Sequence, residues 1–316
     1  MNEKLILQLM FAKGIGDVAL KKILSYFSHN DSVYYADVFA SAENIEKHLG
    51  ISRDISTSII SEQNIELTET TYYKLKTKDI KIISEYDERY PEMLRASLGD
   101  KCPPVLFVEG NENLLNTDAV GFCGSRKVSP KGLEVTRECS KQLAEKKVTV
   151  VSGYAAGTDL TAHNAALQYG GNTIFVLAEG ILRKAIKNEI RNELGDNNYL
   201  FVSQFPPNLT WNAGNAMKRN GTIIGLSKLM ILVESGVSGG TFAAGEETLK
   251  ARRPLFVIDF AKPEVSAEAN PYFISKGGIP IRGKNGIPNM SNVFMSIDNY
   301  ITNNRNDSVE QLKIAF

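Results

Sequence analysis

The sequence has little of the chemistry that builds metal clusters, disulfide frameworks or membrane spans. It contains three cysteines in 316 residues, and the number and spacing of Cys102, Cys123 and Cys139 exclude a cysteine metal cluster and a disulfide framework. The longest apolar runs, such as residues 229–233, are far shorter than the roughly 20 residues that a membrane span needs. The N-terminus does not have the layout of a cleavable signal. We therefore expect a cytoplasmic protein with no metal site and no membrane partner.

The chain also has no excess charge of either sign. Its 36 basic and 36 acidic residues cancel, so a nucleic-acid partner would have to be attracted by a local cluster of cations and not by the net charge. An apolar content of 43% is sufficient for a substantial core. The length allows two domains of roughly 150 residues each.

The first part of the chain, residues 1–75, predicts a small all-helical domain. Apolar residues recur at helical spacing on both sides of a turn that contains Gly14 and Gly16. This arrangement is similar to a helix-hairpin-helix element, in which backbone amides of the turn bind a phosphate. The same pattern also fits a turn that only packs two helices together. Residues 76–104 are charged and interrupted by prolines, and they predict a linker that packs on the next domain.

From residue 105 onward, short apolar runs alternate with helical patterns, which predicts an α/β domain over residues 105–284. Strands that alternate with helices form a Rossmann-like, doubly wound, mostly parallel sheet. The predicted strands are residues 105–108, 119–123, 148–151, 173–178, 199–203, 229–234 and 255–260. Residues 285–316 predict a polar C-terminal tail, either partly disordered or docked as a helix through Val309, Leu312 and Ile314.

Three glycine-rich loops each follow a predicted strand and begin a helical pattern. They span residues 121–126, 152–159 and 235–241. If the strands are parallel, all three loops lie at one edge of the sheet, where unpaired amides at helix N-termini bind anions. The glycine spacing matches neither the Gly-x-Gly-x-x-Gly fingerprint nor the Walker loop, which disfavours an NAD-dependent oxidoreductase and a nucleotide hydrolase. The loops therefore predict a phosphate-sized anion site, and no cofactor is expected.

Cationic side chains accompany these loops. Arg126 stands at a strand-to-helix turn, where a guanidinium can hold a phosphate through two parallel hydrogen bonds, and Lys127 is next to it. Arg126 could instead pair with an acid from a neighbouring loop and only hold the turn. Arg183, Lys184 and Lys187 begin another crossover at the same predicted edge, so several cations would line one rim.

Residues 210–221 mix aromatic, amide and basic side chains ahead of a predicted strand. Such a segment can follow a nucleic-acid backbone while Trp211 stacks on a base, or it can be a helix start whose tryptophan packs in the core. Asp159 and His163 are four residues apart and would share one face of a helix. A structural role for this pair, with Asp159 capping the helix, is the favoured interpretation.

These segments together resemble the DprA/Smf family of DNA-processing proteins. The resemblance runs from about Leu9 to Ile281, and its motifs are specific jointly although each alone is weak. The motifs are Tyr90-Pro91-x-x-Leu94, Pro104-Val105-Leu106-Phe107, Gly124-Ser125-Arg126, Ser152-Gly153-x-Ala155-x-Gly157-x-Asp159-x-x-Ala162-His163, Gly171-x-Thr173-Ile174, Arg219-Asn220, Ile223-Ile224-Gly225-Leu226-Ser227 and Ser238-Gly239-Gly240-Thr241.

The resemblance implies a non-enzymatic protein that binds single-stranded DNA at the sheet edge, forms a homodimer and loads a RecA-type recombinase during natural transformation. It implies that Gly124, Ser125 and Arg126 contact the DNA backbone, while Gly153 and Gly157 shape a loop. The full set of predicted nucleic-acid-binding residues is Gly124, Ser125, Arg126, Lys127, Gly153, Gly157, Arg183, Lys184, Lys218, Arg219, Asn220, Gly239, Gly240 and Thr241. No catalytic residue is predicted.

The sequence departs from the family pattern at several positions. Lys184 stands where the family usually has tyrosine, Gly221 where it has arginine, and Gln204 where it has glutamate. The last thirty residues are too short for the C-terminal winged helix that many members carry. We therefore expect a divergent member, and the sequence leaves open whether it serves transformation, a mobile element or phage defence.

Two other functions compete with this interpretation. Gly239-Gly240-Thr241, followed by Glu246 and Glu247, partly matches the loop and glutamate of a nucleotide-binding phosphoribohydrolase. The motif is one glycine short and its glutamate is offset, so the carboxylate needed for acid-base chemistry is not in place. The other alternative is a defence protein that senses a small nucleotide and signals through oligomerisation.

Overall fold

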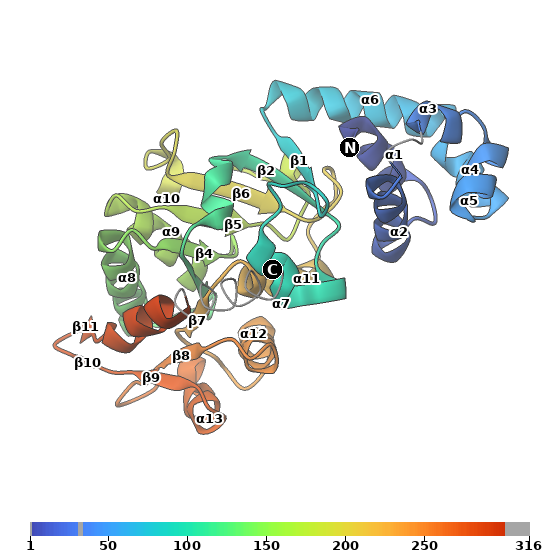
Figure 1. The fold of residues 1–316 in the computed structure, drawn as a ribbon. Coiled ribbons are helices and arrows are strands. Elements are labelled where there is room, and N and C mark those ends of the chain that lie inside the picture. The colour runs from blue at the N-terminus through green and yellow to red at the C-terminus, as the bar shows by residue number, and fades with distance from the viewer. Residues whose placement is uncertain (1, 31–33, 301–316) are drawn as a thin grey trace, which may run out of the picture.

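The computed structural model describes residues 2–30 and 34–300, and Figure 1 shows a helical N-terminal part beside a larger part built on one sheet. The helices of the N-terminal part are α1 (Glu3–Phe11), α2 (Asp17–Ser28), α3 (Tyr35–Val38), α4 (Ala42–Leu49), α5 (Arg53–Ile59) and α6 (Glu62–Thr77). Ser41 and Ser61 cap α4 and α6 by accepting a hydrogen bond from the first turn. Gly14 has a φ of 93°, which lets the chain turn between α1 and α2. The predicted helical region is confirmed.

A nine-stranded sheet carries the larger part, in the order β1-β2-β6-β5-β4-β3-β7-β8-β9. Its strands are β1 (Lys81–Ser84), β2 (Val105–Gly110), β3 (Ala119–Cys123), β4 (Thr149–Ser152), β5 (Thr173–Val176), β6 (Tyr199–Ser203), β7 (Leu229–Leu232), β8 (Leu255–Ile258) and β9 (Ile279–Ile281). Only β1 with β2 and β2 with β6 pair antiparallel among the described strands of this sheet. From β3 the chain adds β4, β5 and β6 on one side of β3, and then it adds β7, β8 and β9 on the other side. The predicted doubly wound, mostly parallel sheet is confirmed.

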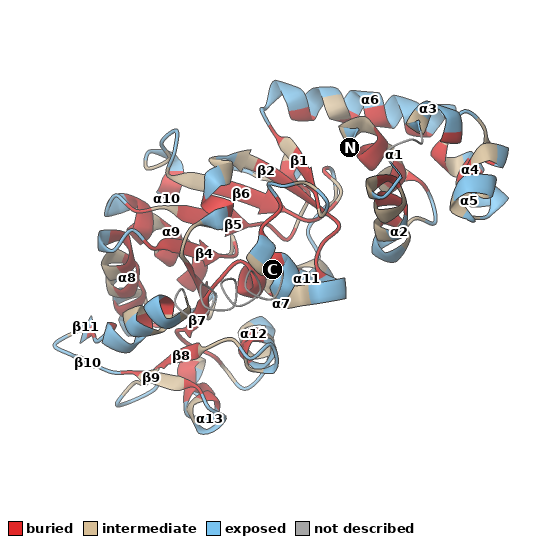
Figure 2. Cartoon of the chain, in the orientation of Figure 1, coloured by how far each residue is buried: buried red, intermediate tan, exposed pale blue. Residues whose placement is uncertain are grey.

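Helices cover both faces of this sheet. One face packs against α8 (Pro130–Glu145), α9 (Thr158–Gln168) and a helix over residues 291–300, and the other against α7 (Glu92–Leu98), α11 (Ala213–Gly225), α12 (Gly240–Lys250) and α13 (Asn270–Ser275). Val120 and Phe122 of β3 face the first layer, while Ala119 and Cys123 face the second, because side chains alternate along a strand. Burial on both faces gives the continuous apolar runs of the sequence, and Figure 2 shows the strands as the buried centre.

Short helices complete the connections between strands. They are α10 (Asn188–Arg191), η1 (Gly99–Lys101), η2 (Glu112–Asn116), η3 (Ile181–Arg183) and η4 (Val265–Ala267). The last of these lies beside the loop that follows β7, because the Ser266 hydroxyl donates to Glu234 at 2.7 Å.

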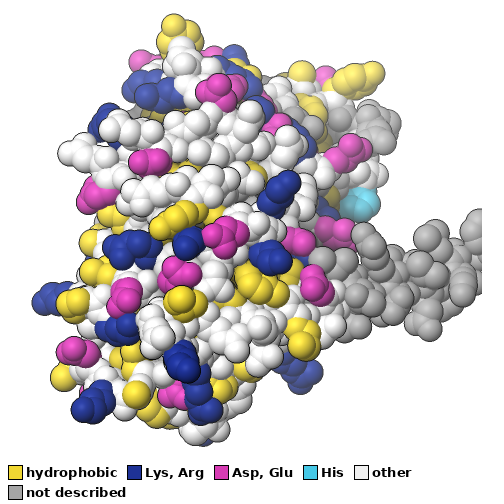
Figure 3. All heavy atoms as spheres, turned by 90° about the vertical axis from the view of Figure 1, so that its left-hand side faces the viewer, with side chains coloured by type: hydrophobic (Ala, Val, Ile, Leu, Met, Phe, Trp, Pro, Cys, Tyr) yellow, Lys and Arg dark blue, Asp and Glu magenta, His cyan; other side chains and the backbone are white. Residues whose placement is uncertain are grey.

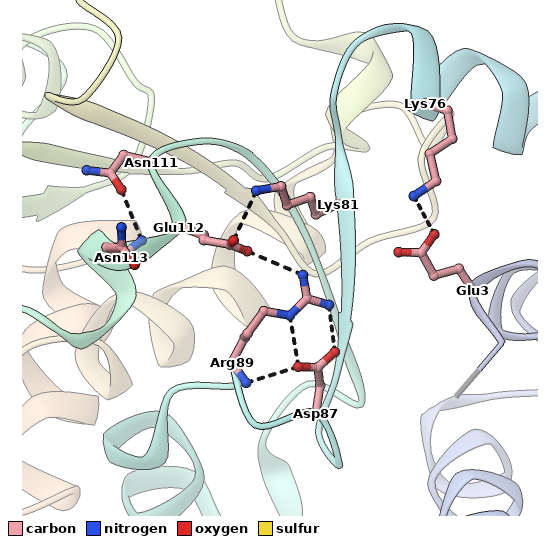
Figure 4. A network of polar contacts seen from close by, with 8 residues as sticks. All are labelled: Glu3, Lys76, Lys81, Asp87, Arg89, Asn111, Glu112 and Asn113. Carbon is pink, nitrogen blue, oxygen red and sulfur yellow. Dashed lines mark hydrogen bonds and ion pairs between the residues drawn. The ribbon is translucent and has the colours of Figure 1, made fainter.

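The segment predicted as a linker contributes β1 to the edge of the sheet. A network of ion pairs holds this segment beside η2 (Figure 4). Lys81 Nζ lies 3.0 Å from Glu112, and Arg89 binds Asp87 through two side-chain hydrogen bonds of 2.7 and 2.9 Å. These pairs are partly exposed and orient the segment more than they stabilise it. The run of four strand residues is too short to stand out from the charged and proline-containing sequence around it.

The N-terminal helices share a buried apolar cluster with the sheet part, and α2 adds polar contacts. Asp17 at the start of α2 forms an ion pair with Lys218 of α11. Lys21 Nζ lies 3.3 Å from Glu85 and donates to the Asp100 carbonyl at 3.0 Å. These contacts fix α2 against the layer that contains α11.

The chain after β9 continues as the hairpin of β10 (Gly283–Lys284) and β11 (Ile287–Pro288). In the following helix, Val293 and Ile297 are buried against the layer of α8. The predicted apolar stripe of the tail, Val309, Leu312 and Ile314, lies outside the described residues. Across residues 2–30 and 34–300, no helix combines the length and the apolar character required to cross a membrane.

Candidate nucleic-acid interface

The three glycine-rich loops lie together at the carboxyl ends of their parallel strands, which form one edge of the sheet. β3 is parallel to both β4 and β7, so the loops that follow these strands leave from the same edge. With α11 they enclose a cleft of about 380 Å³, which we call the loop cleft. Its lining includes Gly124, Ser125, Arg126, Asn220, Gly240 and Thr241. The cleft stands where the chain changes winding direction, which is the place where open α/β sheets bind ligands.

Contact between two of the loops accounts for the glycine at position 157. Gly157 has a φ of 80°, and a Cβ there would lie 2.6 Å from the carbonyl oxygens of Ser125 and Arg126. The N–H and the hydroxyl of Thr158 both donate to the Ser125 carbonyl, at 3.3 and 3.2 Å. A side chain at position 157 would therefore displace the loop that carries Arg126.

Helix α12 begins at the loop cleft with unbonded backbone donors. No described side chain caps this helix, and Gly239 precedes it with a φ of 94°. The first N–H groups of a helix have no partner within it, and the helix dipole adds partial positive charge. A Cβ at Gly239 or Gly240 would meet no atom within 4 Å. Gly240 and Thr241 line the loop cleft, so the start of α12 is open to an anion.

Two buried charges of opposite sign form the floor of the loop cleft. Arg219 is 6% exposed, its Nη1 donates to the Val176 carbonyl at 3.2 Å, and its Nε has no partner among the described residues. Burial raises the pKa of Asp159, and the nearby Arg219 opposes this rise. Burial lowers the pKa of Arg219, and Asp159 opposes that change. A Cβ on Gly153 would lie 1.6 Å from Nη1, so this buried arginine requires glycine at position 153.

His163 of α9 supports the Gly153 loop from below. Its Nε2 lies 2.6 Å from the Gly153 carbonyl oxygen, and its Nδ1 lies 2.6 Å from the Thr173 hydroxyl. Burial lowers the pKa of His163 to about 3, so the ring is neutral. Because a carbonyl only accepts and the ring is neutral, we assign the ring proton to Nε2. The Thr173 hydroxyl also lies 3.0 Å from the Val150 carbonyl oxygen, and we assign its single proton to Nδ1, which is nearer at 2.6 Å. These buried hydrogen bonds fit the structural role predicted for His163.

A second cleft, of about 320 Å³, adjoins the loop cleft, and we call it the side cleft. Its lining includes Arg126, Tyr154, Glu179, Lys187 and Trp211. The guanidinium carbon of Arg126, which lines both clefts, lies 5.6 Å from the centroid of the Trp211 ring. Lys187 Nζ donates to the Tyr154 carbonyl at 2.7 Å and lies 4.4 Å from the centroid of that ring. Trp211 is 49% exposed, so its ring is available for stacking and is not core packing.

Two of the predicted cations are bound to acids elsewhere. Lys184 Nζ lies 2.6 Å from Glu109, and its side chain is largely buried. Lys218 pairs with Asp17 of α2. Neither lysine lines the loop cleft or the side cleft. The sequence places both near the sheet edge but gives no sign of the acids that approach them.

The remaining predicted cations differ in their surroundings. Arg183 Nε donates to the Asn208 carbonyl at 3.0 Å. In the part of the chain that the structure describes, Arg126, Lys127 and Lys187 form no ion pair, although Asp159, Glu189 and Glu179 lie near enough to Lys187 to act on its pKa. By contrast, Figure 3 shows basic and acidic side chains interspersed over the face that lies at the left of Figure 1. Arg126 and Lys187, which line the clefts without an ion pair, thus give them a local positive character that the neutral total charge conceals.

Several lining residues are absent from the predicted set. Glu179 lies just beyond the carboxyl end of β5, and Tyr154 lies in the second glycine-rich loop, so their positions after strands could have indicated them. Ser266 lines the loop cleft from η4, and no sequence pattern marks it. It binds Glu234, which is buried and also accepts from the Ser129 N–H at 2.8 Å.

A comparison with known families covers the whole sheet. Residues 81–287 match the family described as DNA recombination-mediator protein A. The chain belongs to this family. The match begins at β1 and ends at β11, and it confirms the resemblance carried by the glycine-rich motifs.

Individual members of the recombination-mediator family agree with this assignment. The Smf protein of Synechocystis sp. is 28% identical over 251 residues, which cover 78% of this chain and 62% of that protein. The structure of DNA processing protein A from Streptococcus pneumoniae has a TM-score of 0.73 at 23% identity and covers 91% of this chain and 97% of that one. A structure of DNA processing protein A from Helicobacter pylori, which concerns the single-stranded DNA binding mode of that protein, has a TM-score of 0.56 at 21% identity and covers 71% of this chain and 96% of that one.

The two solved structures show that this chain has the fold of the recombination-mediator family. The chain spans less than two thirds of the length of the first curated relatives that it matches, the Smf proteins of Synechocystis sp. and Escherichia coli.

The alternative phosphoribohydrolase site lacks its glutamate. Glu246 accepts a hydrogen bond from the Tyr272 hydroxyl at 3.0 Å, and Glu247 lies on the side of α12 that faces Gly221 of α11. In the described structure neither carboxylate lines the loop cleft. A sugar bound at Gly240 and Thr241 would therefore have no carboxylate from these positions.

Proposed function

We propose that the loop cleft and the side cleft together bind single-stranded DNA. The observation that carries this proposal is the position of Arg126, which lines both clefts, lies beside Trp211 and is not paired with any described acid. A phosphate at the loop cleft would meet the guanidinium and the first amides of α12. The base attached to it would enter the side cleft and stack on Trp211.

The two clefts favour a single strand over a duplex. A base of a single strand can turn out into the side cleft at little cost, whereas a base of a duplex must first be unpaired from its partner. The related protein of Helicobacter pylori has a single-stranded DNA binding mode, which supports the same ligand class for this chain.

In the cell we propose a non-enzymatic role in DNA processing and recombination. The description of the matching family as a DNA recombination mediator supports this role. The partner would be a RecA-type recombinase, and the protein would act as a homodimer in the cytoplasm. Light scattering of the purified chain, with and without an oligonucleotide, tests the homodimer.

A titration of labelled single-stranded and double-stranded oligonucleotides at two salt concentrations tests the binding proposal. We expect single strands to bind more tightly, with affinity that falls as salt rises because each neutralised phosphate releases counterions. Equal affinity for both forms, or binding that does not depend on salt, would contradict the proposal. Thermal stabilisation by a mononucleotide but not by oligonucleotides would favour the nucleotide-sensing alternative.

A further inference from the structure

An acidic side chain stands in the cleft that would receive the DNA base. Glu179 lines the side cleft with Arg126, Lys187 and Trp211. A carboxylate repels a phosphate backbone, so its presence beside these two cations weakens general binding to a polyanion. Because the carboxylate opposes phosphate binding here, we expect the side cleft to bind a different part of the DNA, the base.

The Glu179 carboxylate has no partner of its own. Its side chain makes no hydrogen bond or ion pair with any residue between positions 2 and 30 or 34 and 300. Burial raises the pKa of Glu179, and the charges of Lys187 and Arg183 only partly oppose this rise. By comparison, the largely buried Glu109 is bound by Lys184, and the buried Glu234 accepts hydrogen bonds from two serines. Glu179 is therefore a half-buried acceptor in the lining of the side cleft, with no side-chain partner among the described residues.

The chemistry of the bases decides which one such an acceptor suits. A carboxylate has two acceptor oxygens and no donor when ionised. Guanine presents two neighbouring donors on its Watson–Crick edge, the N1–H and the N2 amino group. Thymine has one donor between two acceptors, while cytosine and adenine each place an acceptor beside their amino group. Only guanine can therefore bind both carboxylate oxygens without bringing an acceptor against them.

We infer that the side cleft is a guanine-selective base site, in which Glu179 accepts from N1–H and the N2 amino group while Trp211 stacks on the ring. This inference rests on the proposed function, because the base is delivered by a DNA strand held at the loop cleft. Lys187 and Tyr154 line the same cleft, and the hydrogen bond between Lys187 Nζ and the Tyr154 carbonyl joins them. Binding by this protein would then tolerate most sequences but anchor at guanines.

Fluorescence anisotropy with short oligothymidylates tests the inference. Each oligonucleotide carries one central guanine, adenine, cytosine or thymine, so that no guanine quadruplex can form. We expect the guanine oligonucleotide to bind roughly tenfold more tightly than the others, within the range of a bidentate base contact. In Glu179→Gln this ratio should fall to about one, because the amide has an NH2 donor group in place of one of the two acceptor oxygens. Glu189→Gln removes a nearby exposed carboxylate outside the cleft and should retain the tenfold ratio.

Two modified bases separate the carboxylate from the cations of the cleft. Hypoxanthine lacks the N2 amino group and should lose most of the preference. The analogue 7-deazaguanine keeps the Watson–Crick edge but lacks N7, the atom that arginine or lysine reads, and should keep the preference. A preference that is lost with 7-deazaguanine would assign guanine recognition to Arg126 or Lys187 and overturn our inference.

The remaining outcomes are also decisive. Equal affinity for all four oligonucleotides, or a guanine preference that persists in Glu179→Gln, overturns the guanine site while the proposed DNA binding stands. Failure to bind any oligonucleotide overturns the proposed function itself. Competition by dGMP as effective as that by the guanine oligonucleotide would reassign the site to a free nucleotide and overturn its assignment to DNA.

Discussion

The guanidinium of Arg126 lies over the ring of Trp211, 5.6 Å from its centroid, although the two residues belong to different loops. A cation over an indole face at an exposed site contributes about 0.5–1 kcal/mol, enough to bias the orientation of both side chains. The pair joins the loop cleft, where backbone amides face the solvent, to the side cleft, where a base can enter. In the proposed interface, this contact holds the cation that would bind a phosphate next to the ring on which a base would stack, before any DNA binds.

Charge reversal at this position is the most direct test of the interface. We expect Arg126→Glu to weaken binding of single-stranded DNA at least tenfold, because it removes a cation and adds an anion where a phosphate would bind. The slope of log affinity against log salt should decrease by roughly 0.7 for each lost phosphate contact. Lys146→Glu at the end of α8 is the matched control. This exposed lysine lies just before β4, at the opposite end of the strands from the loop cleft. Identical affinities for the two variants would contradict the proposed site.

The single tryptophan provides a direct optical signal. We expect its fluorescence to be quenched on addition of single-stranded DNA, because a base would stack on the exposed Trp211 ring. Trp211→Ala should weaken binding by about 1–3 kcal/mol, and Trp211→Phe should restore part of the loss. Unchanged fluorescence at saturating DNA would show that the side cleft does not receive a base.

Alanine substitutions at two glycines distinguish the cost of backbone strain from the cost of displacing a neighbouring loop. Gly157 and Gly170 both have positive φ, but a Cβ at Gly170 would meet no atom within 4 Å, whereas one at Gly157 would strike two carbonyls. We expect Gly170→Ala to lower the free energy of unfolding by about 1–2 kcal/mol, and Gly157→Ala by about 1–3 kcal/mol more. Urea denaturation measures both. Only Gly157→Ala should also weaken DNA binding, and equal effects of the two substitutions on binding would contradict the loop contact.

The neutral His163 makes stability depend on pH. The pKa of the folded form is about 3, below the ordinary value of 6.5, so the unfolded chain binds a proton between these values and the folded chain does not. Stability from this group is complete above pH 7 and falls as the pH drops below 6.5. We expect a loss of about 1.4 kcal/mol at pH 5.5 relative to pH 7.5.

Urea denaturation at several pH values measures this loss. The difference between wild type and His163→Gln isolates it, because Asp159 and other acids titrate in both proteins. A difference that stays constant from pH 7.5 to pH 5.5 would rule out a neutral buried ring.

The parallel strands and their loops could be predicted because their signals are local. A strand such as β3 is buried on both faces and therefore has only apolar residues and glycine, and the glycine-rich loop follows it directly. Strand β1 could not be predicted because it has four residues and lies between charged and proline-containing segments. Its position depends on pairing with β2, which no local pattern reveals.

The candidate site could be predicted only in part, for a related reason. Arg126 and Gly157 belong to loops whose position follows from the sheet topology. The pairing of Lys184 with Glu109, and of Lys218 with Asp17, depends on how distant segments pack. A sequence shows which residues carry charge but not which charges are neutralised. The same limit hid Glu179, whose proposed role depends on the absence of a partner among the described residues.

The antiparallel pairing of β2 with β6 also bears on how the protein is made. Phe107 pairs with Ser203, so β2 leaves the ribosome well before its neighbour in the sheet has been synthesised. Contacts between residues so far apart in the chain form slowly, and an unpaired strand edge can associate with other chains in the meantime. We expect that truncated or stalled chains ending before β6 aggregate, and that refolding of the full chain is limited by the closure of this pair.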